Sequence, residues 1–582
     1  MKPLESERAV GPAAAELEDV SFTYAGGDRE ALQEVDFELR PGEMVGIMGA
    51  SGAGKSTLAK CLNRIVPRFE NGTFRGIVRV GGRAFDGERV CDVASMVGMV
   101  FQDFEAQLFS TNVAHEVAFA MEQIGMPRDE IAARIGPALA AVGLAGFDDR
   151  DPTSLSGGEK QRLAIASVLA LRPGVVVLDE PTSDLDPEGK AEVFALIHRM
   201  RGQGVSLVVI EHEAEELRNC DRIVLLREGK IIAHGPPAEL MVRLELLEDC
   251  GVHPPDVNRV MDALGMHAHA ASVEEAETII RAHFPRTAAT IATMPVSSEP
   301  APQPRIPEPR TNDENAQPFL RVEQLSFAYP FGPRVLDDVT LAIAAGEFVA
   351  IIGQNGSGKT TLAKHLVGLL APSAGKILIG GRNRATLHPA ETAHEVGYVF
   401  QNPDHQIFAA TVGDEVAFGP RNFGLDDVEI ARRSEEVLRV VNLTSERDRD
   451  PFLLSKGERQ RLAVASVLAL RPRMLILDEP TTGLDYREQR RMMALVSDLN
   501  RAGIAIVMIT HTPWLVAEYA RRLVLMREGR VMFDGGVREF FERDELLANS
   551  SFRPPEATML GRRFGFTALR PEELADWIKA RS

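Results

Sequence analysis

Two segments of this chain carry residue types that bind and cleave a nucleoside triphosphate. GASGAGKST at 49–57 and GQNGSGKTT at 353–361 both fit G-x-x-x-x-G-K-[ST]. In this pattern the backbone N–H groups and the lysine, here Lys55 or Lys359, cradle phosphates, while the next hydroxyl, Ser56 or Thr360, binds Mg²⁺. One such loop alone indicates only nucleotide binding.

Each phosphate-binding loop is followed by the same residue types in the same order. The glutamines, serines, glutamates and histidines of the two copies lie 299 positions apart (511 − 212): Gln102 and Gln401, Ser156 and Ser455, Glu180 and Glu479, His212 and His511. The lysines lie 304 positions apart (359 − 55). We infer that one ATPase module has been duplicated.

The residues after the loops predict phosphoryl transfer, which needs positioning and charge neutralisation. Asp179 and Asp478 end apolar segments, VVVLD and LILD, where a carboxylate can reach a metal. The next residue, Glu180 or Glu479, can orient or deprotonate the attacking water. An Asp-Glu pair alone is often a solvated strand end, but its recurrence before Pro-Thr in both copies favours catalysis. The histidines that close the next predicted strand are expected to contact the γ-phosphate.

Strands alternating with helical stretches must position these residues. Alternating apolar residues at 17–24 and 322–329 predict an opening strand in each copy. MVGIMG and FVAIIG then lead into the phosphate-binding loops, and LAKCLNRI and LAKHLVGL begin helices with their N-termini toward the phosphates. VVVLDE, LILDE, LVVIEH and AIVMITH are typical of buried parallel strands. The pattern predicts an α/β core with a largely parallel sheet.

Composition narrows the function classes. The 582 residues carry a formal net charge of −19, which argues against nucleic-acid binding and against direct adsorption to anionic lipid. The four cysteines are far apart and include no C-x-x-C, so we expect reduced thiols. No apolar run approaches the ~20 residues needed to cross a bilayer, and the N-terminus lacks a signal-peptide core. We expect any membrane role to depend on partner proteins.

Composition also divides the chain. Seven prolines between 286 and 318 predict a semi-extended linker. The two tails share Pro-Pro and a later acidic helix start, HPPDVNRVMDALG with SVEEAETIIRA and RPPEATMLGRRFG with RPEELADWIKA. The predicted domains are a first ATPase domain at 16–245, its extension at 246–285, the linker at 286–318, a second ATPase domain at 319–545 and its extension at 546–582.

The signature segments give the chain a family resemblance. LSGGEKQR at 155–162, and LSKGERQR at 454–461 with Lys456 in place of Gly157, resemble the signature of ABC ATPases. SDLD at 183–186 and TGLD at 482–485 resemble the D-loops of that family. The resemblance implies an α/β fold with two P-loop ABC nucleotide-binding domains in tandem, each with a small helical C-terminal extension.

The resemblance also implies a set of site residues, with ATP and Mg²⁺ as cofactors. In the family two cassettes face head to tail, so each signature serves the opposite phosphate-binding loop. The implied catalytic residues are Glu180, Glu479, His212, His511, Gln102 and Gln401. The implied nucleotide contacts are Tyr24, Gly49, Ser51, Gly52, Gly54, Lys55, Ser56, Thr57, Ser156, Gly157, Gly158, Tyr329, Gly353, Asn355, Gly356, Gly358, Lys359, Thr360, Thr361, Ser455 and Gly457. The implied metal ligands are Ser56, Gln102, Asp179, Thr360, Gln401 and Asp478.

The glutamine segments point to one branch of the family. FQNPDHQIF at 400–408 resembles a segment of energy-coupling factor importers of vitamins or metal ions, whereas FQDFEAQLF at 101–109 departs from it. The resemblance implies a transmembrane coupling subunit and a small substrate-binding membrane subunit as partners, no nucleic acid, and a peripheral position on the cytoplasmic face of the membrane. One chain per transporter is expected, because both cassettes are fused.

Two alternatives stay open. One is the fused ATPase of a conventional ABC importer served by an extracellular binding protein, and the other is a soluble, ribosome-associated ABC-F protein. The short Pro-rich linker and the acidic charge argue against the ABC-F alternative, whose members carry a long, charged, helical arm between the cassettes.

Three further expectations concern single residues. Glu116, Asp414 and Glu415 are expected to face the arginines of a membrane partner, unless the neighbouring Phe109 and Phe408 only fill the cassette core. Lys456 is expected to make the two ATP sites unequal, because it adds a charge and lacks the freedom of glycine to adopt positive φ. Nothing in the sequence explains why Glu211 stands where the second copy has Thr510.

Overall fold

The computed structural model describes residues 12–27, 29–84, 90–183, 185, 187–266, 268–285, 318–330, 332–550 and 552–581. The predicted linker lies outside these residues except for Pro318, as do Asp184 and Asp186 of the first predicted D-loop. The chain divides into two compact units, 1–258 with 485–487 and 259–484 with 488–582. Each unit contains one phosphate-binding loop.

A six-stranded sheet forms the centre of the first unit, in the order β10-β9-β3-β8-β7-β6. The strands are β3 (Met44–Gly49), β6 (Val97–Val100), β7 (Val175–Asp179), β8 (Ser206–Ile210), β9 (Arg222–Arg227) and β10 (Lys230–Gly235). All neighbouring pairs are parallel except β9 with β10. The prediction of a largely parallel sheet is confirmed, and the carboxyl ends of β3, β7 and β8 bring the predicted site residues to one edge.

A second, antiparallel sheet has the order β2-β1-β4-β5. Its strands are β1 (Ala15–Tyr24), β2 (Leu32–Leu39), β4 (Gly72–Val80) and β5 (Arg83–Ala84). Leu17 lies opposite both Phe37 and Val78 in the register, and these apolar side chains share a core with β3. The alternation at 17–24 therefore predicted a strand correctly, but not the antiparallel sheet to which it belongs.

The helices of the first unit cover the parallel sheet and extend from it. They are α1 (Lys55–Leu62), α2 (Ile65–Arg68), α3 (Val90–Ala94), α4 (Val113–Gln123), α5 (Arg128–Ala141), η1 (Pro152–Ser154), α6 (Gly157–Leu169), α7 (Pro187–Gly202), η2 (Ala214–Leu217), α8 (Pro237–Leu240) and α9 (Leu244–Asp249). Helix α10 (Asp256–Ala263) begins in the first unit, and its residues from 259 onward belong to the second. Helices α4, α5 and α6 pack on one another, and their apolar residues join a core with β7 and β8. This core carries the signature segment at the start of α6.

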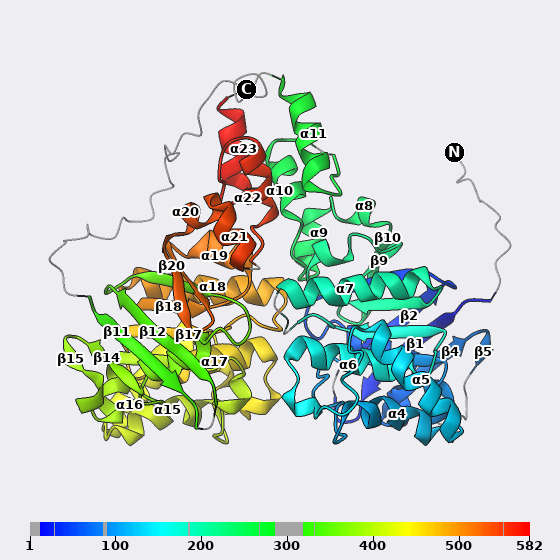
Figure 1. The fold of residues 1–582 in the computed structure, drawn as a ribbon, viewed down its shortest axis with the longest axis horizontal. Helices are drawn as coiled ribbons and strands as arrows, with labels where there is room; N and C mark the ends of the chain where they lie inside the picture. The colour runs from blue at the N-terminus through cyan, green and yellow to red at the C-terminus, as the bar shows by residue number, and fades with distance from the viewer. Residues whose placement is uncertain are drawn as a thin grey trace. The chain divides into compact units, whose positions relative to one another are not determined.

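The second unit repeats both sheets in the same order, β20-β19-β13-β18-β17-β16 and β12-β11-β14-β15. Its strands are β11 (Leu320–Ala328), β12 (Arg334–Ile343), β13 (Phe348–Ile352), β14 (Ala374–Ile379), β15 (Arg382–Asn383), β16 (Val396–Val399), β17 (Met474–Asp478), β18 (Ala505–Ile509), β19 (Arg522–Arg527) and β20 (Arg530–Gly536). Figure 1 shows β11 and β12 side by side. The shared strand order supports the inferred duplication.

The helices of the second unit follow the same plan. They are α13 (Lys359–Leu366), η3 (Arg384–Thr386), α14 (Pro389–Glu395), η4 (Pro403–His405), α15 (Val412–Asn422), α16 (Asp427–Val440), η5 (Thr444–Glu446), η6 (Pro451–Leu453), α17 (Lys456–Leu468), α18 (Tyr486–Arg501), α19 (Pro513–Tyr519), α20 (Val537–Glu542) and α21 (Asp544–Ser550). Within the described ranges, no helix combines the length and the apolar composition that spanning a bilayer requires.

Helices also occupy both predicted extensions. They are α11 (Val273–His283) in the first extension, and α22 (Glu556–Arg563) and α23 (Pro571–Lys579) in the second. Within the second unit, α11 lies beside α22 (Figure 1). Arg563 pairs with Glu277 at 3.0 Å and also with Glu274, and the guanidinium of Arg281 lies 4.7 Å from the ring centroid of Phe564. The two extensions are thus joined by ion pairs and an aromatic contact.

Candidate nucleotide-binding and active sites

The first phosphate-binding loop joins β3 to α1 and folds around its own lysine. Lys55 Nζ donates to Gly49 O at 2.8 Å and to Ala50 O at 3.0 Å. Burial lowers the pKa of Lys55, although Glu180 and Asp179 oppose the shift. A Cβ on Gly54, whose φ is +103°, would lie 2.5 Å from Ala31 O, so only glycine fits at the start of α1. The other predicted contacts of this loop, Ser51, Gly52, Ser56 and Thr57, lie on the same turn or on α1.

The second loop has the same geometry. Lys359 Nζ donates to Gly353 O at 2.7 Å and to Gln354 O at 2.9 Å. A Cβ on Gly358, whose φ is +99°, would meet Val335 O at 3.0 Å. Asn355, Gly356, Thr360 and Thr361 complete this predicted loop between β13 and α13. Both lysines are therefore held against the carbonyl groups of a loop whose backbone N–H groups suit an anion.

Asp179 ends β7 and lies beside the P-loop hydroxyl of Ser56. Burial raises the pKa of Asp179 to about 6, against a hydrogen bond from Ser56 that lowers it. Asp179 Oδ1 is buried and has no hydrogen-bond partner. A buried, unpaired carboxylate oxygen next to a hydroxyl is a donor set that suits Mg²⁺, so the predicted ligand pair fits the metal.

Asp478 holds the same position in the second copy but has an additional partner. Thr360 Oγ1 donates to Asp478 Oδ1 at 3.3 Å, and the Tyr398 hydroxyl donates to Asp478 Oδ2 at 2.8 Å. The position matching Tyr398 in the first copy is Met99, which accepts a hydrogen bond from Asn63 instead. Tyr398 was not predicted, because in the sequence it is one apolar-looking residue of a short buried strand, β16.

Glu180 contacts three side chains of the first site. Glu180 Oε1 lies 2.7 Å from His212 Nε2, and Glu180 Oε2 accepts from Gln102 Nε2 at 2.6 Å and from Ser183 Oγ at 3.1 Å. Burial would raise the pKa of Glu180, but His212, Lys55 and Ser183 outweigh it and lower the pKa to about 2. The structure therefore brings the predicted glutamine, glutamate and histidine together around one carboxylate.

Glu479 makes fewer contacts in the second site. Glu479 Oε1 lies 2.9 Å from His511 Nδ1, while Glu479 Oε2 is buried without a hydrogen-bond partner. Among the described residues, Gln401 makes no hydrogen bond to Glu479, and its side chain is exposed. The second glutamine is thus not brought to the carboxylate as the first one is.

Both glutamates share a backbone feature that sequence reasoning missed. The φ angle is +50° at Glu180 and +49° at Glu479, in the left-handed region that non-glycine residues rarely adopt. Such strain persists only where the surrounding structure enforces it, and it is common at active sites. No residue-type signal could have predicted it, because glutamate has no preference for this conformation.

The predicted aromatic contacts lie at the ends of the opening strands. The Tyr24 hydroxyl lies 2.9 Å from Thr57 Oγ1, and burial raises the pKa of Tyr24 to about 12. Tyr329 is 41 % exposed and packs edge-on against Phe327. Tyr24 therefore lies against the helix of the phosphate-binding loop, and Tyr329 has a free ring surface.

The signature serines cap the helices that follow them. Ser156 caps α6 and Ser455 caps α17, and each forms a capping box with the glutamate three residues on. Gly157 and Lys456 are the first residues of these helices, where φ is negative for any residue. The backbone reason for unequal sites, that lysine lacks the freedom of glycine at positive φ, is therefore wrong, because neither residue has a positive φ. The Lys456 ammonium instead lies where a Cβ on Gly483 would be.

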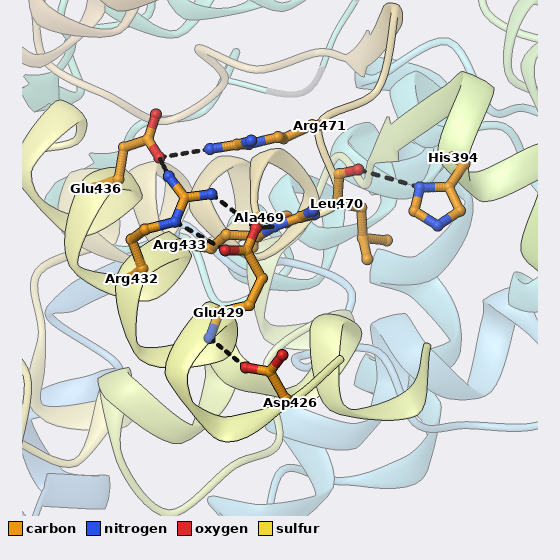
Figure 2. Close-up of polar contacts among 9 residues, drawn as sticks. All are labelled: His394, Asp426, Glu429, Arg432, Arg433, Glu436, Ala469, Leu470 and Arg471. Atoms are coloured by element: carbon orange, nitrogen blue, oxygen red, sulfur yellow. Dashed lines mark hydrogen bonds and ion pairs between the residues drawn. The ribbon is translucent and has the colours of Figure 1, made fainter. Parts of the chain in front are cut away.

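An arginine closes the other end of each signature helix. In the second copy Arg433 Nη1 donates to Ala469 O at 3.1 Å, and Arg433 Nε pairs with Glu429 at 2.7 Å (Figure 2). In the first copy Arg134 Nη1 donates to Ala170 O at 3.0 Å. A cation at a helix C-terminus is favourable to the helix dipole, so α5 and α16 hold the signature helices in place.

The segments that follow the glutamines are anchored by buried carboxylates. Glu116 is 3 % and Glu415 2 % exposed. Glu116 Oε2 accepts from Phe109 N at 3.0 Å and Ser110 N at 2.8 Å, and Glu415 Oε2 accepts from Phe408 N at 3.0 Å. The expectation that these two glutamates face a partner is therefore wrong, because both satisfy backbone donors of their own cassette.

The aromatic residues of these segments point outward instead. Phe109 is 61 % and Phe408 59 % exposed, and each packs edge-on against another exposed ring, Phe119 or Phe418. Asp414 is also exposed and lies in the first turn of α15, where the hydroxyl of the N-cap residue Thr411 donates to it at 2.8 Å. The two phenylalanines do not fill the cassette core, and each copy presents an apolar pair beside its glutamine.

Comparison with known proteins also finds one matching segment in each copy. The profile of the family described as "ABC transporter" matches residues 32–183 and 336–482. A protein of Caldanaerobacter subterraneus subsp. tengcongensis is 44% identical over 569 residues, covering 97% of this chain and 98% of its own. One from Methanosarcina acetivorans is 40% identical over 574 residues, covering 97% and 94%. Both are named "Putative ABC transporter ATP-binding protein".

A solved structure is also similar in sequence to part of the chain. It is cbiO1 from Clostridium perfringens, described as part of the ABC transporter complex cbiONQ. Its identity is 34%, it covers 43% of this chain and 98% of its own, and the TM-score is 0.38.

Proposed function

Because the chain belongs to the ABC transporter family and is an ATPase, we propose that it is the ATP-hydrolysing, energy-coupling subunit of an importer of the energy-coupling factor type. Such an importer takes up a vitamin or a metal ion through separate membrane subunits. The observation that supports this type is FQNPDHQIF at 400–408, which ends in the exposed Phe408. The chain would lie peripherally on the cytoplasmic face of the membrane, as one copy per transporter.

We assign binding of the ATP phosphates to the two loops. The N–H groups that follow Gly49 and Gly353 would surround the phosphates, and Lys55 and Lys359 would exchange their loop carbonyls for phosphate oxygens. Mg²⁺, held through the hydroxyl of Ser56 and the carboxylate of Asp179, would neutralise phosphate charge. In the second cassette, Thr360 and Asp478 would hold it.

We assign the hydrolytic step to the glutamates. Glu180 would orient a water molecule and accept its proton as the water oxygen attacks the γ-phosphorus. Its pKa of about 2 keeps the carboxylate ionised. His212, which contacts Glu180 at 2.7 Å, would hold that carboxylate and donate to the γ-phosphate. The resulting ADP and phosphate would leave with the proton passed to solvent. Glu479 and His511 would act in the same way in the second cassette.

The exposed phenylalanine pairs would dock the membrane partner. Each pair follows the glutamine that the resemblance places at the metal, so its backbone can transmit the nucleotide state outward. Exposed paired rings beside a polar rim are typical of interaction sites. Changing Phe109 and Phe408 to Ala should leave the ATPase rate of the purified chain within about twofold, because neither ring is in the core. The same change should release the chain from membranes that contain its partner.

The matched control for docking is Met532→Ala, an equally exposed apolar residue on β20 at 54 %. It should leave membrane association unchanged. Undiminished membrane association of the double phenylalanine variant would contradict the assigned surface.

Copurification from native membranes tests the importer type. The proposal expects a transmembrane coupling subunit together with a small substrate-binding membrane protein. A permease pair with an extracellular binding protein would instead identify a conventional importer. Cosedimentation with ribosomes, with no membrane subunit, would identify an ABC-F protein.

A further inference from the structure

A buried polar cluster lies beside the first active site and has no counterpart in the second. It consists of Thr182, Lys190 in α7, Glu211 directly before His212, and Glu216 in η2. The positions 299 residues further on (510 − 211) are Thr481, Gln489, Thr510 and Leu515. Only the first threonine is kept, so the charged members belong to the first copy alone.

Hydrogen bonds connect these four side chains. Thr182 Oγ1 lies 2.8 Å from Glu211 Oε1 and 3.3 Å from Glu216 Oε2. Lys190 Nζ donates to Glu216 Oε1 at 3.0 Å and pairs with Glu213 at 3.5 Å. Thr182 is 0 % and Glu211 3 % exposed, whereas the side chains of Glu216 and Lys190 are 11 % and 22 % exposed, so it is the contact between Thr182 and Glu211 that is shielded from water.

The contacts of Thr182 suit a pair of carboxyl groups of which one is protonated. A hydroxyl has one hydrogen and can donate to only one of two carboxylates. The Thr182 hydroxyl is satisfied on both sides when it donates to one carboxylate and accepts from the other in its protonated form. Burial raises the pKa of Glu211 well above its usual range, with Glu216 adding to the shift, and burial also raises the pKa of Glu216. Both raised pKa values favour a protonated carboxyl in this pair.

The cluster connects the segments that follow β7 and β8, which the contact between Glu180 and His212 also connects. Glu180 and Thr182 lie after β7, and Glu211 and His212 lie after β8. Glu180 bonds His212 and Thr182 bonds Glu211, so two parallel side-chain bonds connect these strand ends. The backbone N–H of Glu180 also donates to Ile210 O at 3.0 Å, so the bond between Thr182 and Glu211 adds a second side-chain constraint to a segment that the backbone and His212 already hold.

The second copy has one of these bonds only. Glu479 contacts His511, but the Thr510 hydroxyl accepts from the backbone of Thr512 at 3.1 Å. Among the described residues, Thr481 makes no hydrogen bond to Thr510. The segment that follows Glu479 therefore lacks the second side-chain bond that a carboxylate provides in the first copy.

We propose that Glu211 is a positioning residue of the first ATPase site, which acts through Thr182 to fix the segment that carries Glu180 relative to His212. This inference rests on the assignment of Glu180 and His212 to hydrolysis. Glu216 and Lys190 complete the cluster as the second carboxyl group and the balancing charge. The alternative is that the cluster has only a structural role beneath the ends of β7 and β8.

Two substitutions of Glu211 separate these alternatives. Glu211→Gln keeps a carbonyl oxygen for Thr182 and an N–H donor for Glu216, and so imitates the protonated carboxyl. Glu211→Thr gives the residue of the second copy and is too short to reach Thr182 in the same way. A positioning role predicts that Glu211→Gln stays within about twofold of wild type and that Glu211→Thr loses about tenfold, the effect of one hydrogen bond on a rate.

The assay must report each cassette separately. The full chain is incubated with radiolabelled 8-azido-ATP, Mg²⁺ and vanadate, and the cross-linked ADP is assigned to a cassette by peptide mapping. Glu211→Thr should lower labelled ADP in the first cassette about tenfold, with azido-ATP affinity and labelling of the second cassette within twofold. The matched control Thr510→Val should leave the second cassette within twofold.

Three results would overturn the inference. They are unchanged labelling of the first cassette in Glu211→Thr, an equal loss in both cassettes, and a loss in Glu211→Gln as large as in Glu211→Thr. Glu180→Gln is the separate check on the underlying assignment. If Glu180→Gln still forms labelled ADP in the first cassette at the wild-type rate, the assignment of Glu180 fails instead.

Discussion

Glu116 is the residue whose replacement tests most directly how the segment after the first glutamine is held. Its Oε2 atom accepts two backbone hydrogen bonds, from Phe109 at 3.0 Å and Ser110 at 2.8 Å, and the side chain is 3 % exposed. Glu116→Ala leaves both N–H groups without this acceptor. A hydrogen bond to a charged group contributes about 1.5–3 kcal/mol. Because Phe109 lies at the surface, water can replace part of each bond, and we take the lower end, about 3 kcal/mol for the pair.

Hydrogen exchange measures this loss at the two amides. A loss of about 3 kcal/mol corresponds to about a hundredfold faster exchange, since about 1.4 kcal/mol is a factor of ten. Exchange of the peptide 104–117 in the full chain is followed by mass spectrometry. Glu116→Gln keeps an oxygen in the same place and loses only the charge, so exchange should rise less than about tenfold. The matching segment held by Glu415 provides an internal reference and should not change.

Wild-type exchange at 104–117 in Glu116→Ala would refute the reasoning. It would mean that the segment after the glutamine is held by its side chains and not by this carboxylate. An equal increase in the Ala and Gln variants would show that the charge, and not the acceptor geometry, holds the two amides.

Three further predictions concern the proposed site residues. Changing Lys55 and Lys359 together to Ala should abolish ATP binding, measured by equilibrium dialysis, and wild-type hydrolysis by this variant would contradict the loop assignment. Glu479→Gln should cost more turnover in the assembled transporter than Glu180→Gln, because the resemblance pairs Lys359 with the intact LSGGE signature; equal losses would argue against unequal sites. Because the pKa of Glu180 is lowered in the folded protein, its ionised form adds to the free energy of unfolding at pH values above the usual glutamate pKa. This contribution is lost as the pH falls toward 2. The midpoint temperature of unfolding should therefore fall more between pH 6 and pH 3 in the wild type than in Glu180→Gln. An equal fall in both proteins would refute the lowered pKa of Glu180.

The parts of the site that the sequence predicted are those fixed by a local pattern. Glycines with positive φ, a lysine six or seven residues after the strand and a carboxylate at a strand end define the predicted phosphate-binding loop and its metal side without reference to the rest of the chain. The structure places Lys55, Ser56 and Asp179 together as this pattern requires. The parallel sheet was predictable for the same reason, because short β-branched runs between helices leave few other arrangements.

The parts that the sequence did not predict depend on contacts between distant segments. Glu116 and Glu415 look like surface acids in VAHEVAFA and VGDEVAFG, one turn into a helix. Each is buried because the preceding loop returns over the helix and brings two backbone N–H groups to the carboxylate. The strand Tyr398 likewise becomes a partner of Asp478 only when β16 and β17 pair in register.

Comparison of the two copies explains why equal spacing does not imply equal sites. Features set by the backbone recur in both, including the left-handed glutamates Glu180 and Glu479. The neighbouring side chains have diverged. Gln102 bonds Glu180 and Glu211 bonds Thr182 in the first copy, whereas Tyr398 bonds Asp478 in the second. A carboxylate fixed by several bonds needs less reorganisation before it accepts a proton than one with an unpaired oxygen. The environment of each glutamate therefore favours the first site, in opposition to the signature Lys456. The loss of turnover in Glu180→Gln compared with that in Glu479→Gln thus decides which of these two influences is larger.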